Sequence, residues 1–192
     1  ARVGSPGDAY NAITVGATDL APVSDIAPFS GVGPVGSRFG VNRSKPDVVA
    51  PGASPGADAI DSTANCHEGA KPDFIDVTQG GGEIEGTSMA APHVSGLAAM
   101  LVDYGSTYGL IRDTPTVKAV ILNNATRLGA GAHHPAWSHT FTEPLDPWQG
   151  AGEIDARATM AAYGDDLRVW QQEISAGAKH WYSMDVADAP TT

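Results

Sequence analysis

Cysteine, positive charge and long apolar runs are all scarce in this sequence. Its 192 residues include a single cysteine, Cys66, so an internal disulfide framework is excluded. Lysine and arginine total 11 against 22 aspartate and glutamate residues, and the resulting net charge of −11 opposes binding to nucleic acid or to an anionic lipid surface. No apolar run reaches the roughly 18 to 20 residues that cross a bilayer. We therefore expect no nucleic-acid partner and no membrane partner.

The composition is that of a loop-rich globular protein. Apolar residues make up 42% of the chain, charged residues 17%, and there are 23 glycines and 14 prolines. These values exclude a coiled coil and stay below the glycine and proline content of low-complexity disorder. The chain does not open with methionine or with a signal peptide, which predicts that it is part of a longer precursor.

Two short strands are expected in the first part of the chain. Residues 12–15 and 48–50 are β-prone, and the glycines and prolines after them indicate turns at Gly16 and at Pro51. No hairpin sequence joins the two strands. The stretch from 53 to 82 is rich in turn residues, and we interpret residues 61–79 as an insertion, either a solvated loop or an element that shapes the substrate site or regulates it.

Three helices are expected after this stretch. Residues 89–102 contain ten apolar and no charged residues, which predicts a helix buried on every face and ending at Asp103 and Gly105. Thr114, as a hydroxyl cap, and Pro115 indicate the start of a second helix. Asp155 indicates the start of a third helix, which should stop at Gly164. Weak alternation over residues 170–186 is typical of strands.

The segment most suggestive of catalysis lies at the start of the first of these helices. It reads Gly86-Thr87-Ser88-Met89-Ala90-Ala91-Pro92-His93-Val94-Ser95-Gly96. Ser88 falls in the first turn, where the helix amides and the positive end of the dipole suit a nucleophile whose attack creates an oxyanion. Its own backbone N–H could be a donor to that oxyanion. Taken alone, however, a serine at this place is more often an ordinary helix N-cap.

The eleven-residue string closely resembles the nucleophile motif of the subtilisin-like serine proteases, the subtilases. Three further segments are similar to segments of that family in the same order, namely residues 3–17, 45–52 and 150–162. The resemblance covers roughly Val3 to Tyr163. It implies an α/β fold with a doubly wound, mostly parallel sheet and flanking helices, in which residues 1–164 form the C-terminal portion of the peptidase domain. Residues 165–192 resemble the beginning of an appended β-rich domain or a linker.

The resemblance also implies an activity and a role for several residues. The implied activity is that of a secreted or extracellular serine endopeptidase, in which Ser88 attacks a peptide carbonyl and forms an acyl-enzyme. The N–H of Ser88 matches an oxyanion donor, and Thr87 matches a position whose hydroxyl supports the oxyanion hole. Gly4 matches the base of the primary specificity pocket, which would admit large residues such as Leu, Phe or Tyr. Pro6 matches a site where the family often has a cis bond.

Parts of the family's catalytic machinery have no match in this chain. The order of family segments places the catalytic aspartate, the histidine and the oxyanion asparagine upstream of Ala1. The implied partners are therefore a polypeptide substrate and the upstream part of the same protease domain, and we expect the isolated chain to be inactive. His93 lies about 140° around the helix from Ser88, which favours a structural role. The other histidines are interpreted as belonging to solvated loops or to the tail: His67, His133, His134, His139 and His180.

Two alternatives to a subtilase fragment remain open. One is a catalytically inactive, subtilase-derived binding or scaffold module whose serine serves packing. The other is a different hydrolase in which Ser88 uses a local base. The upstream sequence and the activity of the isolated chain would discriminate among the three.

Metal binding is weakly indicated. Cys66-His67-Glu68 and the histidines at 133, 134 and 139 offer zinc-ligand chemistry, but their spacing matches no standard zinc site and favours surface loops. We expect no cofactor for catalysis. Subtilases often bind structural calcium, and Asp8, Asp19 and Asp25 are candidate oxygen donors here.

Overall fold

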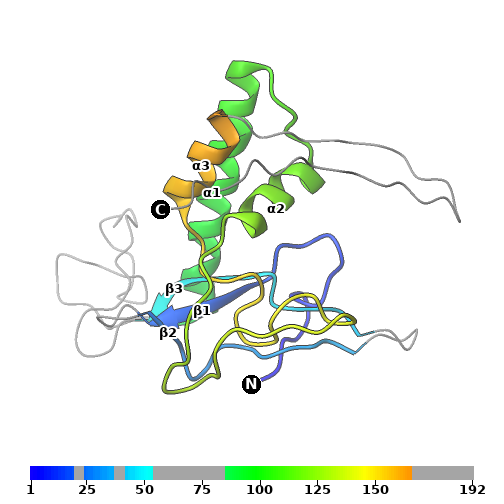
Figure 1. Cartoon of the computed structure of the whole chain (residues 1–192), viewed down its shortest axis with the longest axis vertical. Coiled ribbons are helices and arrows are strands. Elements are labelled where there is room, and N and C mark those ends of the chain that lie inside the picture. Colours follow the sequence, from blue (N-terminus) through cyan, green and yellow to red (C-terminus); the bar gives the residue numbers. More distant parts are fainter. Residues whose placement is uncertain (20–23, 37–41, 54–84, 166–192) are drawn as a thin grey trace, which may run out of the picture.

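The computed structural model describes residues 1–19, 24–36, 42–53 and 85–165. A small mixed sheet lies at one end, and helices rise from it (Figure 1). The strands are β1 (Val15–Asp19), β2 (Asp25–Ile26) and β3 (Val48–Ala53), and the helices are α1 (Thr87–Tyr108), α2 (Thr114–Asn123) and α3 (Ala156–Asp165). The expected α/β class is confirmed at this level. The insertion expected at 61–79 and the strands expected at 170–186 lie outside the described residues.

The central strand, β1, is parallel to β3 and antiparallel to β2. The parallel pair confirms that no hairpin joins the first two expected strands. The strand bounds differ from expectation, because β1 begins at Val15 and runs through Gly16. A Cβ atom at Gly16 would lie 2.8 Å from the Ser30 hydroxyl and 2.9 Å from a Val49 methyl group, so this glycine permits close packing within the sheet and does not end the strand. Likewise, β3 continues through the expected turn at Pro51 to Ala53.

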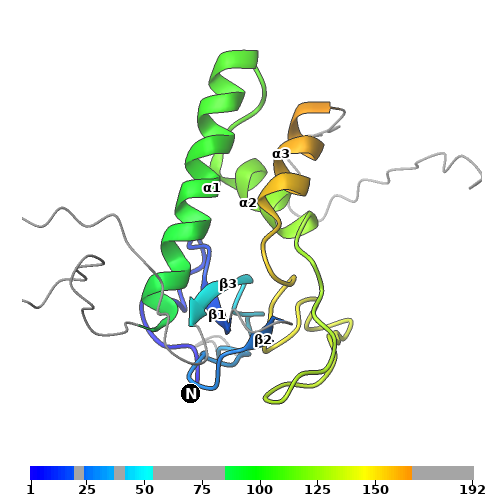
Figure 2. The same ribbon diagram turned by 90° about the vertical axis from the view of Figure 1, so that its left-hand side faces the viewer.

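Helix α1 packs on the sheet along one stripe of its surface. The buried positions follow helical spacing: Ala90, Val94, Leu97, Leu101 and Gly105. Other apolar side chains remain outside, since Met100 is 53% exposed and Val102 is 43% exposed. The expectation of a helix buried on every face is therefore wrong among the described residues, because α2 and α3 lie on the same side of α1 (Figure 2) and leave another face uncovered.

The helix ends are set by contacts that the sequence pattern does not display. Helix α1 passes through Gly105, its expected end, and stops at Gly109, which has the left-handed φ of 70°. The cap of α2 is the carboxylate of Asp113, which accepts the N–H of Thr116 at 3.0 Å, and not the hydroxyl of Thr114. Asp155 caps α3 as expected by accepting the N–H of Ala158 at 2.8 Å. This helix continues past Gly164 to Asp165.

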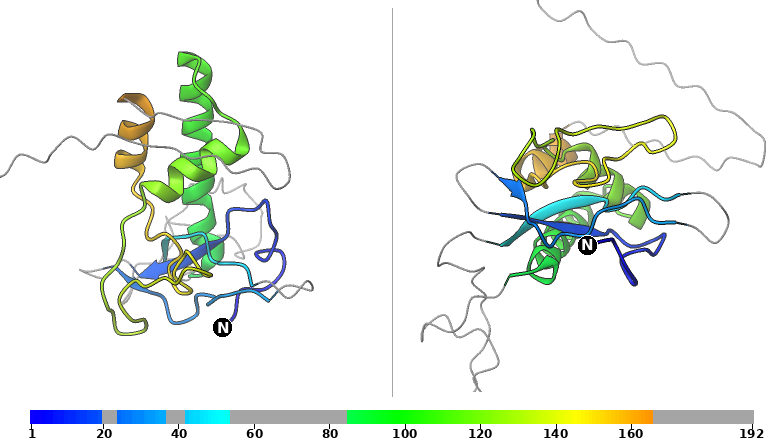
Figure 3. Two further views of the ribbon diagram at one scale, coloured as in Figure 1. Left: turned by 45° about the vertical axis from the view of Figure 1, so that its right-hand side comes forward. Right: turned by 90° about the horizontal axis from the view of Figure 1, so that it is seen from below.

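The connection between α2 and α3 folds back against the sheet, across from the start of α1 (Figure 3). Its end pairs with β3, because the N–H of Val49 donates to the carbonyl of Gly152 and the N–H of Ile154 donates to the carbonyl of Val49. Gly150 adopts a φ of 63°, and a Cβ atom there would lie 2.4 Å from the backbone of Asp47. A glycine is thus required where the connection meets β3. None of the described helices has the length and hydropathy of a bilayer-spanning segment.

Candidate active site

Ser88 lies in the first turn of α1, next to the end of β3. The N–H of Gly86 donates to the carbonyl of Gly52 at 2.8 Å, which fixes the beginning of the helix to the strand. A Cβ atom at Gly52 would lie 2.7 Å from the carbonyl oxygen of Gly86, so the approach depends on this glycine. Gly86 itself has a φ of 154°, a conformation that favours glycine. The glycines on both sides of the contact therefore place Ser88 at the end of the parallel strand.

The hydroxyl of Ser88 is available for chemistry. The side chain is exposed, and it makes no hydrogen bond to another described residue. The N–H groups of Met89 and Ala90 donate to the carbonyl of Gly86 at 2.9 and 3.4 Å. The N–H groups of Thr87 and Ser88, one step earlier, have no acceptor among the described residues. Free amides at the positive end of a helix stabilise a negative oxygen, so this turn places an exposed hydroxyl beside N–H groups suited to that role.

The two other expected site residues differ in their surroundings. Thr87 is partly buried beside Ser88 at the start of the helix. Gly4 is exposed, and a Cβ atom there would meet nothing within 4 Å. The space beside the Gly4 Cα atom is therefore open, and the expected place of Gly4 at the base of the specificity pocket stays a prediction. The bond between Ser5 and Pro6 is cis, as the resemblance implies.

None of the histidines in the described part of the chain contacts Ser88. His93 is exposed, and its Nδ1 lies 3.0 Å from the carbonyl of Met89 on its own helix, which agrees with a structural role. His134 is buried, with Nε2 3.0 Å from Asp25 Oδ1 and Nδ1 2.7 Å from the carbonyl of Pro135. The interpretation of His134 as a solvated loop residue is therefore wrong, because it ties the long connection to β2. The described residues leave the general base of Ser88 unassigned.

The acidic residues considered for calcium do not form a ligand cluster among the described residues. Asp19 and Asp25 are paired across the β1–β2 register, while Asp8 lies in the turn before β1. Burial raises the pKa of Asp19 above its usual 3.8; the charge of Asp25 raises it further, and His133 partly offsets the effect. Structural calcium stays a prediction.

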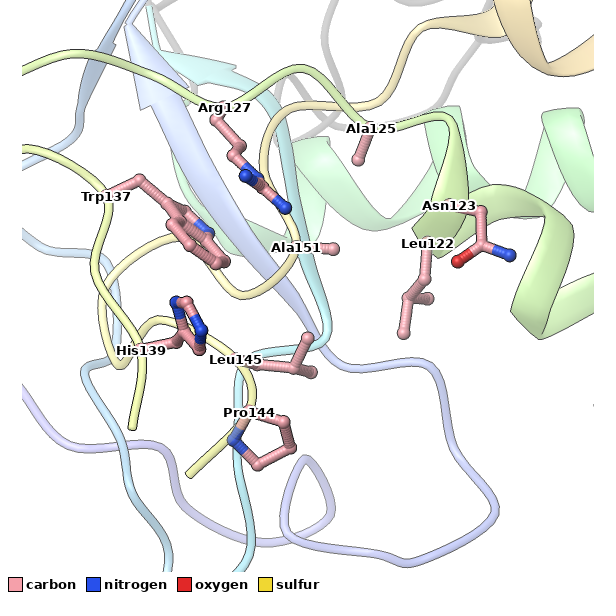
Figure 4. Close-up of a pocket in the computed structure, with 9 residues that line it drawn as sticks. All are labelled: Leu122, Asn123, Ala125, Arg127, Trp137, His139, Pro144, Leu145 and Ala151. Atoms are coloured by element: carbon pink, nitrogen blue, oxygen red, sulfur yellow. The ribbon is translucent and has the colours of Figure 1, made fainter. Parts of the chain in front are cut away.

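A cavity brings together three side chains that reasoning from the sequence did not connect. Arg127, Trp137 and His139 line a cavity between the end of α2 and the long connection (Figure 4). Of the three, only His139 was considered from the sequence, as a weak zinc-ligand candidate. The spacing of the three residues follows neither a helical nor a strand period, so no local pattern connects them.

Comparison with known proteins identifies the family. A sequence model of the Subtilase family matches residues 1–142. The curated protein "Extracellular basic protease" of Dichelobacter nodosus is 30% identical over 190 residues, which cover 93% of this chain and 25% of that protein. This chain thus spans about a quarter of the length of that relative.

Two solved structures agree in fold. The CspB protease of Clostridium perfringens has a TM-score of 0.56 at 25% identity, covering 86% of this chain and 29% of that one. The patellamide maturation protease PatA has a TM-score of 0.52 at 25% identity, covering 82% of this chain and 45% of that one. Because the family match takes in well over half of the chain, including the helix turn that presents Ser88, the protein belongs to the subtilase family.

Proposed function

We propose that this chain carries the nucleophile of a subtilisin-type serine endopeptidase and that peptide bonds are hydrolysed through an acyl-enzyme on Ser88. One observation carries the proposal. In a member of the subtilase family, the exposed Ser88 hydroxyl lies beside two backbone amides that have no acceptor among the described residues. The name of the relative, "Extracellular basic protease", supports action outside the cell.

The chemistry follows from this arrangement. The Ser88 Oγ attacks the carbonyl carbon of the peptide, and its proton passes to a general base. The carbonyl oxygen becomes an oxyanion that accepts a hydrogen bond from the N–H of Ser88, while Thr87 supports the hole. The C–N bond then breaks and the amine leaves with the proton. Water attacks the resulting ester, which releases the acid and restores the hydroxyl.

The general base is proposed to lie outside this chain. None of the described histidines contacts Ser88, so the histidine, its aspartate and the oxyanion asparagine would come from the upstream part of the same protease domain. The large apolar side chains that α1 exposes and the greater length of the similar proteins support this proposal. That no histidine in the described part of the chain contacts Ser88 also supports a second candidate, a non-catalytic binding module that retains Ser88.

Labelling with a fluorophosphonate, which reacts with activated serines, tests the proposal. The whole natural protein should gain one probe mass on intact mass spectrometry, and the Ser88→Ala variant should gain none. Ser95→Ala is the matched control, because Ser95 is exposed on the same helix and its hydroxyl donates to the carbonyl of Ala91 at 3.2 Å. Failure of the natural protein to react would support the binding module, and labelling that persists in Ser88→Ala would contradict the assignment of the nucleophile.

Two digestions extend this test. Residues 1–192 alone should not digest casein, and digestion that disappears in Ser88→Ala would mean that a local base exists. A peptide library treated with the whole protein should be cut after large residues such as Leu, Phe or Tyr, as the match of Gly4 to the specificity pocket implies. Cleavage only after Gly or Ala would contradict that role of Gly4.

A further inference from the structure

The cavity between the end of α2 and the long connection has the size and lining of a small-molecule site. Its volume is about 610 Å³, within the range of ligand pockets. Figure 4 shows Ala151 between two groups of side chains, with Arg127 and His139 on one side and Leu122 on the other. Leu122, Leu145 and Pro144 supply the apolar lining, Arg127 and His139 supply polar groups, and Asn123 lies beyond Leu122, away from Arg127. None of these lining residues is acidic.

The guanidinium of Arg127 is the dominant charge of this cavity. Its central carbon lies 4.0 Å from the centroid of the Trp137 ring, so the guanidinium is held over an aromatic face. It forms no ion pair with a described carboxylate. In Figure 4 the guanidinium points towards Ala151 at the centre of the cavity. The chain has a net charge of −11, yet no acidic side chain lines this cavity. The guanidinium of Arg127 is therefore available to bind an anion.

The surrounding frame holds the Trp137 ring, on which the exposed Arg127 stacks, and the backbone beside Arg127 in place before any ligand arrives. The indole N–H of Trp137 donates to the carbonyl of Gly150 at 2.8 Å, and the ring of His139 packs on the same indole at 4.9 Å between centroids. Gln149, which is fully buried, accepts the N–H of Leu128 at 2.7 Å, next to Arg127. These bonds fix both segments that form the cavity, and preorganisation of this kind lowers the cost of binding.

We propose that this cavity binds a carboxylate carried by an apolar group. The planar N–H groups of Arg127 match the two oxygens of a carboxylate, which a lysine would not. Leu122 and Leu145 would take the apolar part out of water. Two sources share this chemistry, the C-terminal end of a peptide with an apolar last residue and a free short-chain carboxylic acid.

Titration with three ligands distinguishes these two sources from each other and from nonspecific binding. The whole natural protein with Ser88→Ala, which prevents turnover, is titrated with N-acetyl-Ala-Ala-Leu, with its C-terminal amide, and with 4-methylpentanoate. Binding is followed by calorimetry and by the NMR shift of the Trp137 indole N–H. The peptide acid should bind about tenfold more tightly than the amide, the loss expected for one charge-assisted contact. If 4-methylpentanoate also binds, a free carboxylic acid is sufficient as the ligand. If it does not bind, the ligand is the C-terminal end of a peptide.

Variants then locate the contact. Arg127→Gln should weaken binding of the peptide acid about tenfold, and Arg127→Lys should restore only part of the affinity. Arg157→Gln, at an exposed arginine of α3, is the matched control and should bind as the parent does. Unchanged thermal midpoints would show that the fold is retained. Equal binding of acid and amide, an unaltered affinity in Arg127→Gln, or no binding at millimolar ligand would each overturn the proposal.

Discussion

Asp47 is almost fully buried, and its carboxylate forms ion pairs with the ammonium groups of Lys45 and Lys118. Lys45 Nζ lies 2.6 Å from Oδ2, and Lys118 Nζ lies 2.7 Å from Oδ1. The N–H of Thr14 also donates to Oδ2 at 2.7 Å. Burial lowers the pKa of Lys45 below 10.5, and the hydrogen bond to Asp47 opposes that shift. The carboxylate thus keeps a buried ammonium charged at the point where β3 begins.

Asp47→Asn should lower the free energy of unfolding by about 3 to 5 kcal/mol, because it leaves the ammonium of Lys45 buried without a counter-charge. Urea unfolding followed by circular dichroism measures the change. Asp103→Asn, at an exposed site on α1, is the control and should unfold near the parent midpoint. Equal midpoints for Asp47→Asn and the parent would show that the ion pairs contribute nothing net.

Asp19 should make stability depend on pH in the acid range. Its folded-state pKa is raised, first by burial and then by Asp25, so the folded state binds more protons than the unfolded state between pH 3.8 and the raised value. The free energy of unfolding therefore falls as pH rises through this window. Asp19→Asn removes the effect and should be more stable than the parent at pH 7, with the advantage shrinking below pH 3.8. Urea midpoints of the variant and the parent at pH 3.5 and pH 7 test this prediction. A difference in midpoint that is the same at both pH values would contradict it.

Individual residues were predictable where the signal is local. The motif around Ser88 is contiguous, so both its place in the first helical turn and its neighbours follow from the sequence. The pairing of His134 with Asp25 joins segments more than a hundred positions apart, and no local pattern reports it. The same applies to Arg127 and Trp137, which meet because Gln149 and Gly150 hold the connection in place.

At the scale of elements, type was predictable and boundaries were not. The apolar run after Met89 and the Thr114-Pro115 start correctly predict helices, because both signals depend on neighbouring residues. The strand bounds at Gly16 and Pro51 were wrong, because packing partners from distant segments decide whether the chain continues straight. The end of α1 was wrong for the same reason, since Gly105 packs against α3.

Two glycines in α1 should respond in opposite ways to alanine. A Cβ atom at Gly105 would lie 2.4 Å from the Tyr163 hydroxyl, so Gly105→Ala should destabilise the fold by about 1 to 3 kcal/mol through overpacking. A Cβ atom at Gly96 would meet nothing within 4 Å among the described residues, so Gly96→Ala should stabilise this chain by about 0.5 to 1 kcal/mol through helix propensity. Thermal unfolding of both variants tests the pair, and a shift of the same sign in both would contradict the packing around Gly105.

At the scale of the molecule, α1 leaves large apolar side chains in water on more than one side. Met100, Val102 and Tyr108 are 53, 43 and 64% exposed, and such surface promotes association in water. Residues 1–192 alone should therefore bind the dye ANS and self-associate. Replacing Met100 and Val102 together by glutamine should reduce dye fluorescence and the weight-average mass in sedimentation, without loss of helical circular dichroism. Unchanged association would mean that another surface is responsible.

The pairing of β3 with residues 152–154 also constrains how the protein is made. β3 leaves the ribosome early, whereas the backbone groups that bond its outer side, at Gly152 and Ile154, are synthesised about a hundred residues later. Until then that side of the strand has unpaired N–H and C=O groups, the kind of edge that recruits other chains. Nascent chains that stall before Gly150 would carry this open edge, so the period of greatest aggregation risk is set by translation speed over the long connection, and chaperone binding would be needed most during that interval.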